Sequence, residues 1–198
     1  MNCLIVKTHP LSDSLSASLA QQAIDLLQSV GHDVDVEDLY TNRFDASLTE
    51  NERRSYYAGP YCGKQVAPQI ERLLQAEAIV LVFPTWWFGF PAILKGWFDR
   101  VWAPGVAYEH ADEYGRIKPR LTKLRHMLAI TSLGSPWWVD RLVLRQPVRR
   151  VLKTAIVGTC APQCSFDILS LYKSEQLTPA QVKRFGERME RVLRRWQV

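Results

Sequence analysis

The sequence is poor in cysteine and has no long hydrophobic run. Four cysteines among 198 residues are too few for a disulfide scaffold, so we expect free thiols in a reducing cytoplasm. No stretch reaches the roughly 20 consecutive apolar residues of a membrane span. The first ten residues lack the basic start and the apolar length of a signal peptide. We therefore expect a cytoplasmic protein without stable membrane insertion.

Several catalytic and binding motifs are also missing. There is no G-x-G-x-x-G, no P-loop, no G-x-S-x-G and no H-E-x-x-H. Cys160 and Cys164 are spaced C-x-x-x-C, without the second pair or nearby histidine that a zinc site needs. The stretch HADE (110–113) is typical of a solvated loop. We expect no metal site, and we expect a bound cofactor to supply the chemistry.

The net charge of +5 comes largely from the C-terminal half. Basic residues in 145–153 and 183–196 alternate with apolar ones at helical spacing. This pattern is typical of solvated helix faces, so we expect no nucleic-acid partner. A positive field would still favour cofactors that carry phosphates.

Apolar runs alternate with helical patterns along the chain, which indicates an α/β fold with a parallel sheet in one domain, 1–198. The expected strands are 3–7, 33–39, 78–83, 126–131 and 165–171. The expected helices are 15–30, 49–57, 66–75, 91–102, 140–153 and 178–196. Gly31 is expected to cap the first helix, and Thr178 with Pro179 to start the last.

The strand patterns favour a doubly wound five-stranded sheet of order 2-1-3-4-5, with helices on both faces. The strand at 33–39 alternates polar and apolar residues as an edge strand does, whereas 3–7, 78–83 and 126–131 are continuously apolar. In this order a ligand crevice lies at the carboxyl ends of the first, third and fourth strands. The loops there are 8–16, 84–90 and 131–138.

The first and third loops carry hydroxyl groups. His9, Ser14 and Ser16 stand at the start of a helix, where they could bind a phosphate or simply cap the helix. Thr131 and Ser132 are followed by Gly134, which could let backbone approach a ligand or could be an ordinary turn residue.

The second loop is aromatic. Trp86, Trp87 and Phe88 lie between Pro84 and Gly89, in a segment expected on the surface. Three interpretations stay open: a platform for a flat ligand, a subunit interface, or part of the core. The following helix, 91–102, has a broad aromatic face, and we expect part of that face at a dimer interface.

These residues resemble the flavodoxin-like NAD(P)H:quinone oxidoreductases, in their short form. The resemblance rests on FP-x-x-WFG-x-PAILKGWFDRV (83–101) with AY (107–108), on LIVKTHPLSDSLS at the N-terminus, and on AITSLG (129–134). It spans roughly residues 2–135. It departs at Leu133, where long members have a glycine, and at PWWVDR (136–141), where they place a Tyr–His relay.

The resemblance implies a flavin site. The cofactor would be FAD, with FMN as the alternative because some short members use it. His9, Ser14, Leu15 and Ser16 would hold the phosphate. Pro84, Thr85, Trp86, Trp87 and Phe88 would line the ring, and Thr131, Ser132 and Gly134 its pyrimidine side. Tyr108 and His110 are candidate catalytic, pocket-lining groups in place of the missing relay.

The resemblance also implies an activity and an assembly. Such enzymes take a hydride from NAD(P)H onto flavin N5 and pass two electrons to a quinone-like acceptor by a ping-pong mechanism. They are homodimers with each active site at the subunit interface. Two alternatives remain: an electron carrier, although carriers usually show an acidic docking face, and a flavin-containing regulatory subunit of a transport system.

Overall fold

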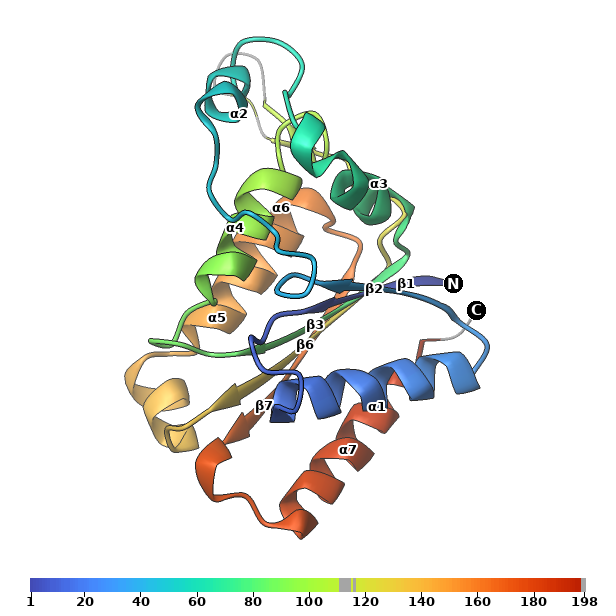
Figure 1. Ribbon diagram of the computed structural model, residues 1–198, viewed down its shortest axis with the longest axis vertical. Helices are drawn as coiled ribbons and strands as arrows, with labels where there is room; N and C mark the ends of the chain where they lie inside the picture. Colours follow the sequence, from blue (N-terminus) through green and yellow to red (C-terminus); the bar gives the residue numbers. More distant parts are fainter. Residues whose placement is uncertain (111–114, 116, 197–198) are drawn as a thin grey trace.

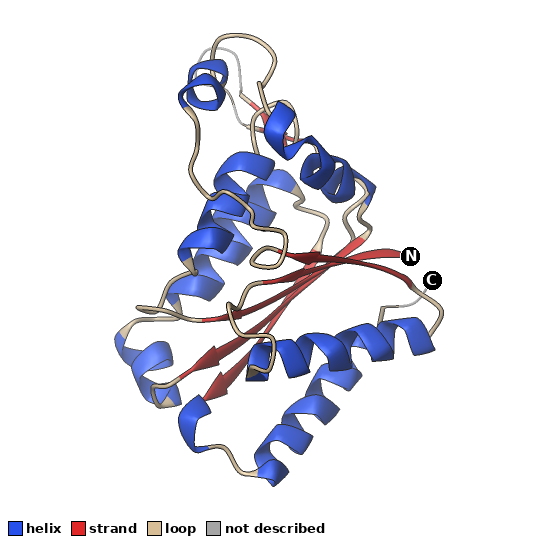
Figure 2. Cartoon of the chain, in the orientation of Figure 1, coloured by secondary structure: helices blue, strands red, loops and turns tan. Residues whose placement is uncertain are grey.

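The fold is built on a five-stranded parallel sheet (Figures 1 and 2). The computed structural model describes residues 1–110, 115 and 117–196. The strands are β1 Asn2–Lys7, β2 Asp33–Asp38, β3 Ala78–Pro84, β6 His126–Leu133 and β7 Ser165–Tyr172. Their order is β2-β1-β3-β6-β7, with every pair parallel. This confirms the predicted order 2-1-3-4-5, with the alternating strand at one edge.

Helices cover both faces of the sheet (Figure 1). They are α1 Leu15–Ser29, α2 Glu50–Ser55, α3 Ala67–Gln75, α4 Ala92–Val101, α5 Pro147–Arg150, α6 Gly158–Cys160 and α7 Pro179–Leu193. Shorter helical turns are η1 Lys64–Val66, η2 Val139–Val143, η3 Val151–Val157 and η4 Ser174–Gln176, and a small antiparallel ribbon joins β4 Tyr108–Glu109 to β5 Lys118–Pro119. Helices α1 and α7 lie together on one face, and α3 to α6 lie on the other.

The central strands supply a core on each side because side chains alternate along a strand. In β1, Leu4 and Val6 pack toward α3 and α4, whereas Cys3 and Ile5 pack toward α1 and α7. Both sets are almost fully buried. The continuous apolar runs in the sequence therefore reflect strands covered on two sides.

Helix ends follow the predicted signals. Gly31 adopts φ +84° after α1, and its N–H donates to Gln28 O while the His32 N–H donates to Leu27 O, both at 3.0 Å. This pair of bonds is a Schellman cap, for which glycine is favoured. At α7, Thr178 and Gln181 form a capping box.

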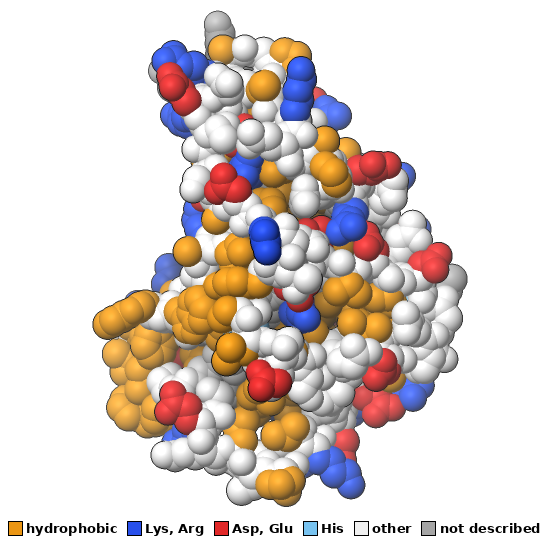
Figure 3. All heavy atoms as spheres, in the orientation of Figure 1, with side chains coloured by type: hydrophobic (Ala, Val, Ile, Leu, Met, Phe, Trp, Pro, Cys, Tyr) orange, Lys and Arg blue, Asp and Glu red, His pale blue; other side chains and the backbone are white. Residues whose placement is uncertain are grey.

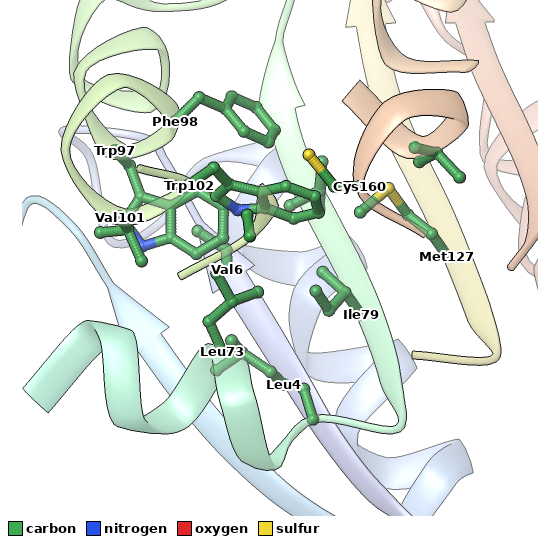
Figure 4. Packing of buried hydrophobic residues seen from close by; sticks show 14 of the residues in the cluster. Leu4, Val6, Leu73, Ile79, Trp97, Phe98, Val101, Trp102, Met127 and Cys160 are labelled. Carbon is green, nitrogen blue, oxygen red and sulfur yellow. The ribbon is translucent and has the colours of Figure 1, made fainter. Parts of the chain in front are cut away.

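The aromatic face of α4 belongs to the core of its own chain (Figure 4). Trp97, Phe98, Val101 and Trp102 are buried against the sheet, with Trp97 and Trp102 in edge-to-face contact at 6.1 Å between ring centroids. The expectation that part of this face forms a dimer interface is therefore wrong. The packing of α4 on β1 and β3 buries the aromatic face of the helix.

The predicted helix 140–153 is interrupted. Arg145 and Gln146 have φ of +56° and +52°, and the chain restarts as α5 with Pro147 in its first turn. Proline disfavours helical backbone in the residue before it, which explains the break. Both η2, before the break, and η3, which follows α5, are wound as π-helix.

A buried ion pair fastens the irregular segment 40–64 to α4. Arg100 and Glu52 are 1% and 2% exposed, and Arg100 Nη2 donates to Glu52 Oε1 at 2.7 Å. The Arg100 guanidinium also donates to Asp45 O at 2.6 Å. Nearby, a Cβ on Gly96 would meet Ala46 O at 2.2 Å, so only glycine allows this approach. Gly96 and Arg100, which belong to the motif at 83–101, therefore hold segment 40–64 against α4.

Among the residues that the structure describes, no helix has the length and apolar character needed to cross a membrane.

Candidate functional site

Three loops meet at the carboxyl edge of the sheet, as predicted. The ends of β3 and β6 are joined by the Thr85 N–H, which donates to Ser132 O at 2.8 Å, and by Thr85 Oγ1 and Thr131 Oγ1, which lie 2.5 Å apart. Thr8, after β1, donates its N–H to Val82 O at 3.0 Å. These hydrogen bonds make the edge of the sheet rigid at the point where the three loops begin.

The first loop presents donors at the N-terminus of α1. Ser14 caps the helix by accepting the Ala17 N–H at 3.2 Å, so the capping role is filled. The N–H groups of Leu15 and Ser16, in the first turn, have no intrahelical acceptor. The Leu11 N–H donates to His9 Nδ1 at 3.1 Å, which holds the imidazole ring beside the start of the helix. This donor set suits a phosphate.

The second loop is a tight turn with left-handed backbone. The Gly89 N–H donates to Trp86 O at 3.0 Å, and between them Trp87 and Phe88 have φ of +52° and +55°. Residues with a side chain rarely adopt this left-handed backbone conformation. Backbone strain of this kind is concentrated at functional sites. Trp87 is fully exposed and Trp86 is 43% exposed. The core interpretation is therefore excluded for both tryptophans, and the ligand and interface interpretations remain.

A flat ligand would have to lie over these loops. The hollow beneath Thr85 and Thr131 has a volume of only about 10 Å³, room for about one water molecule. Pro84, the last residue of β3, is buried below the turn. A ring system placed on the aromatic turn would keep one face open, and a further surface would be needed to cover it.

The third loop is open above Gly134. A Cβ there would come no closer than 3.5 Å to Glu175 Oε1, which is an ordinary contact, so the protein's own packing does not demand glycine. Ser132 is half-buried and Thr131 buried within β6. Trp137 and Trp138, which follow the loop, are about half exposed.

Tyr108 and His110 lie away from the three loops within one chain. They follow the C-terminal end of α4, whereas the aromatic turn precedes its N-terminal end, and ten helical residues span about 15 Å. His110 stacks on Tyr57 at 4.6 Å between ring centroids and meets the edge of Tyr108. Burial raises the pKa of Tyr108 above its usual 10. Their catalytic role stays a prediction.

Sequence reasoning missed a buried polar pair beside the crevice. The Tyr172 hydroxyl, at the end of β7, donates to Asp140 Oδ2 at 2.8 Å, and Asp140 is buried. Arg141 Nε donates to the same hydroxyl at 3.4 Å. Asp140 was expected only as the start of a helix, and no local signal indicates that a residue 32 positions later contacts it.

No cluster of three or more metal-ligating side chains occurs among the described residues. The HADE stretch is only partly covered, because residues 111–113 lie outside the described part of the chain. The four cysteines are free thiols, three of them buried. Burial raises the pKa of the Cys160 and Cys164 thiols to about 12, so neither is an activated nucleophile.

The chain resembles known proteins along most of its length. The model of a family described as flavodoxin-like fold matches residues 1–189. The ribosyldihydronicotinamide dehydrogenase [quinone] of Rattus norvegicus is 32% identical over 82% of this chain and 80% of its own length. A crystal structure of Smu.1420 from Streptococcus mutans matches 98% of this chain and all of its own with a TM-score of 0.83 and 28% identity.

A further relative is longer than this chain. NAD(P)H dehydrogenase [quinone] 1 of Cavia porcellus is 33% identical over 67% of this chain, and the chain spans about half (53%) of that relative's length. The family match, the sheet order and the three converging loops agree with one another. The chain belongs to the flavodoxin-like fold family and, within it, to the NAD(P)H quinone oxidoreductases.

Proposed function

We propose that this protein is a flavin-dependent NAD(P)H oxidoreductase that reduces a quinone or similar acceptor. The observation that carries the proposal is the left-handed turn at Trp87 and Phe88, which presents an exposed aromatic platform where the three loops meet. Two relatives are named as quinone dehydrogenases, which supports the proposal. The free thiols of the chain suit a cytoplasmic enzyme.

The residues at the crevice fit a flavin. His9, Ser14, Leu15 and Ser16 would hold its phosphate, since they combine ring, hydroxyl and backbone donors at a helix N-terminus. The turn 84–88 would support the ring, with backbone N–H groups of Trp87 and Phe88 toward its polar edge. Thr131, Ser132 and Gly134 would border the pyrimidine side. We propose FAD, with FMN as the alternative.

When bound, the flavin would supply the two-electron chemistry by which a hydride from NAD(P)H, taken up at N5, would reach the acceptor in a second, ping-pong half-reaction. The protein would position the rings. The hydrogen-bonded threonines under the turn hold the platform rigid, and rigidity of the first contacts is what such positioning requires.

We propose a homodimer in which a second copy covers the open face of the platform. Tyr108 and His110 follow the C-terminal end of α4, whereas the turn precedes its N-terminal end, so they would line the pocket over the turn only if they belonged to the other copy. This arrangement would give the exposed Trp86 and Trp87 a cover and would use both groups of predicted site residues.

The first experiment identifies the cofactor and the donor. Flavin released by heat is identified chromatographically, and the holoenzyme is assayed with NADH, NADPH and ribosyldihydronicotinamide against quinone, azo and nitro acceptors. Protein that stays colourless in the presence of added flavin would overturn the proposal. Bound flavin without oxidation of any donor would instead indicate an electron carrier.

A matched pair of variants tests the phosphate site. Ser16→Ala removes a buried hydroxyl at the start of α1, whereas Ser18→Ala removes an exposed hydroxyl two residues later. We expect weaker flavin binding for Ser16→Ala, because a hydrogen bond to a charged group is lost, and unchanged binding for Ser18→Ala. Equal affinities would contradict the assignment.

Mixed dimers test the shared site. A Trp87→Gly chain and a Tyr108→Phe chain each carry one defect, so a mixed dimer retains one site with both intact contributions. We expect mixing to restore part of the activity that neither variant has alone. Absence of restoration, with mixed dimers confirmed by mass, would show that each copy works by itself.

A further inference from the structure

A stack of polar and aromatic side chains is exposed beside the C-terminal end of α4. Tyr57, which is 71% exposed, stacks on the His110 ring with 4.6 Å between ring centroids and 29° between ring planes. The guanidinium of Arg53 also lies over the Tyr57 ring, with its Cζ atom 5.2 Å from the centroid. A single tyrosine ring therefore links a cation to one of the predicted site residues.

Hydrogen bonds hold this stack in place. His110 Nε2 lies 3.1 Å from Tyr56 O, and it must be the donor because a carbonyl oxygen only accepts. The Tyr56 hydroxyl donates to Asp99 O in the last turn of α4. Tyr108 meets the His110 ring edge to face at 5.4 Å between centroids. Side chains ordered in this way before a ligand arrives lose less conformational entropy when they bind it.

Arg53 differs from the next arginine of α2 in what it contacts. Its guanidinium lies over the rings of Tyr57 and, at 5.9 Å, of Tyr56, and among the described residues it forms no ion pair with a carboxylate. Arg54 instead pairs with Glu50 at 2.5 Å. Figure 3 shows basic and acidic side chains on the surface over α2, at the upper left of the view. A planar guanidinium stacked on aromatic rings is well suited to bind a phosphate group.

The inference that follows rests on the proposed function and on its homodimer, in which Tyr108 and His110 of one copy cover the aromatic turn of the other. The nicotinamide ring of the donor would then lie beside His110. In a nicotinamide nucleotide a single ribose joins this ring to the phosphate, and in the protein a single tyrosine ring joins His110 to Arg53. We propose that Arg53 of the covering copy binds the phosphate of the dihydronicotinamide donor, and so selects phosphorylated donors over ribosyldihydronicotinamide.

The phosphate of the flavin is the other anion near this site. It fits Arg53 less well, because the first loop already offers hydroxyl and backbone groups at the N-terminus of α1. The two sources of phosphate are separated by experiment, since flavin affinity and donor affinity are measured independently.

Two donors that differ by one phosphate test the role of Arg53. The flavin-loaded enzyme is assayed with reduced nicotinamide mononucleotide and with ribosyldihydronicotinamide, and kcat/KM is measured for each. In Arg53→Gln the ratio of kcat/KM for the mononucleotide to kcat/KM for the riboside should fall about tenfold, through KM, because one hydrogen bond to a charged group is lost. Arg53→Lys should restore part of the ratio, since it keeps the charge without the guanidinium fork.

Arg54→Gln is the matched control. It removes the same charge from the next position of α2, which is also exposed, and it should keep the wild-type ratio. Calorimetric titration gives a second readout that needs no turnover. Oxidised nicotinamide mononucleotide should bind the flavin-loaded wild type more tightly than nicotinamide riboside does, and Arg53→Gln should reduce this preference about tenfold. An unchanged unfolding midpoint verifies the fold of each variant.

The outcomes separate this inference from the proposed function. An active enzyme in which Arg53→Gln and Arg54→Gln give equal donor ratios would overturn the role of Arg53 and leave the proposed function standing. A wild-type enzyme that does not distinguish the two donors would have the same meaning. Weaker flavin binding by Arg53→Gln, with an unaltered donor ratio, would assign Arg53 to the phosphate of the cofactor instead. Protein that binds no flavin would overturn both.

Discussion

Replacing Trp87 by glycine should stabilise the fold while weakening the cofactor site. Trp87 has φ +52° and its side chain is fully exposed, so the substitution relieves backbone strain and loses no packing. The same side chain is the proposed platform for the flavin ring. The two effects therefore have opposite signs, which few substitutions share.

The size of the stabilisation follows from two terms. Left-handed backbone costs a residue with a side chain about 1–2 kcal/mol. Glycine adds about 0.5–1 kcal/mol of conformational entropy to the unfolded chain, which offsets part of the gain. At the midpoints of these two ranges, the net gain in the free energy of unfolding is about 0.8 kcal/mol. For a chain of this length it corresponds to an unfolding midpoint roughly 1–4 °C higher.

The measurement uses thermal unfolding without added flavin, because a ligand that binds the folded state would add its own stabilisation. Trp137→Gly is the control. Trp137 is also an exposed tryptophan, but its φ is not positive, so glycine there should lower the midpoint. Flavin affinity, measured by fluorescence titration, should fall about tenfold in Trp87→Gly, as expected for the loss of one aromatic contact.

Two results would refute the reasoning separately. A lower unfolding midpoint for Trp87→Gly would mean that the turn is not held in a strained left-handed conformation. A higher midpoint with unchanged flavin affinity would mean that the strain is real but the turn does not support the ring.

Further predictions concern the attachment of segment 40–64 to α4. Glu52→Gln should lower the free energy of unfolding by about 3–5 kcal/mol in urea unfolding, because it leaves Arg100 buried without its counter-charge; a loss below 1 kcal/mol would contradict this. The pKa of Glu52 is held below its usual 4.5, because the bonds from Arg100 and Thr49 outweigh the raising effect of burial. Its contribution to stability should thus be complete above pH 4.5, decline as the pH falls through the lower folded-state pKa, and be absent from the acid profile of Glu52→Gln. Gly96→Ala should cost about 1–3 kcal/mol because its Cβ meets the Ala46 backbone, whereas Ala92→Gly, at an exposed position of the same helix, should cost no more than about 1 kcal/mol; equal losses would contradict the close approach.

The sheet and its connections could be predicted because their signals are local. Continuous apolar runs marked β1, β3 and β6, and strict alternation marked the edge strand β2. Glycine and threonine placed the ends of α1 and α7 through caps that involve only neighbouring residues. The convergence of the three loops followed from strand order alone.

Other features could not be predicted because they depend on residues far apart in the chain. The strip of aromatics at 83–102 looks uniform in sequence, yet Trp97 and Trp102 are buried and Trp86 and Trp87 are exposed. Burial was decided by which side chains meet the sheet. The break at Gln146 carried a signal in Pro147, but helical periodicity concealed it.

What the sequence by itself determined is the order of the sheet, its edge strand, its caps and the edge where a ligand would bind, since periodicity and terminal residues encode these over a few positions. Only the tertiary structure decided that Arg100 and Glu52 form a buried pair and that the aromatic turn is left-handed. The ion pair depends on a contact across 48 residues, and no local pattern contains either outcome.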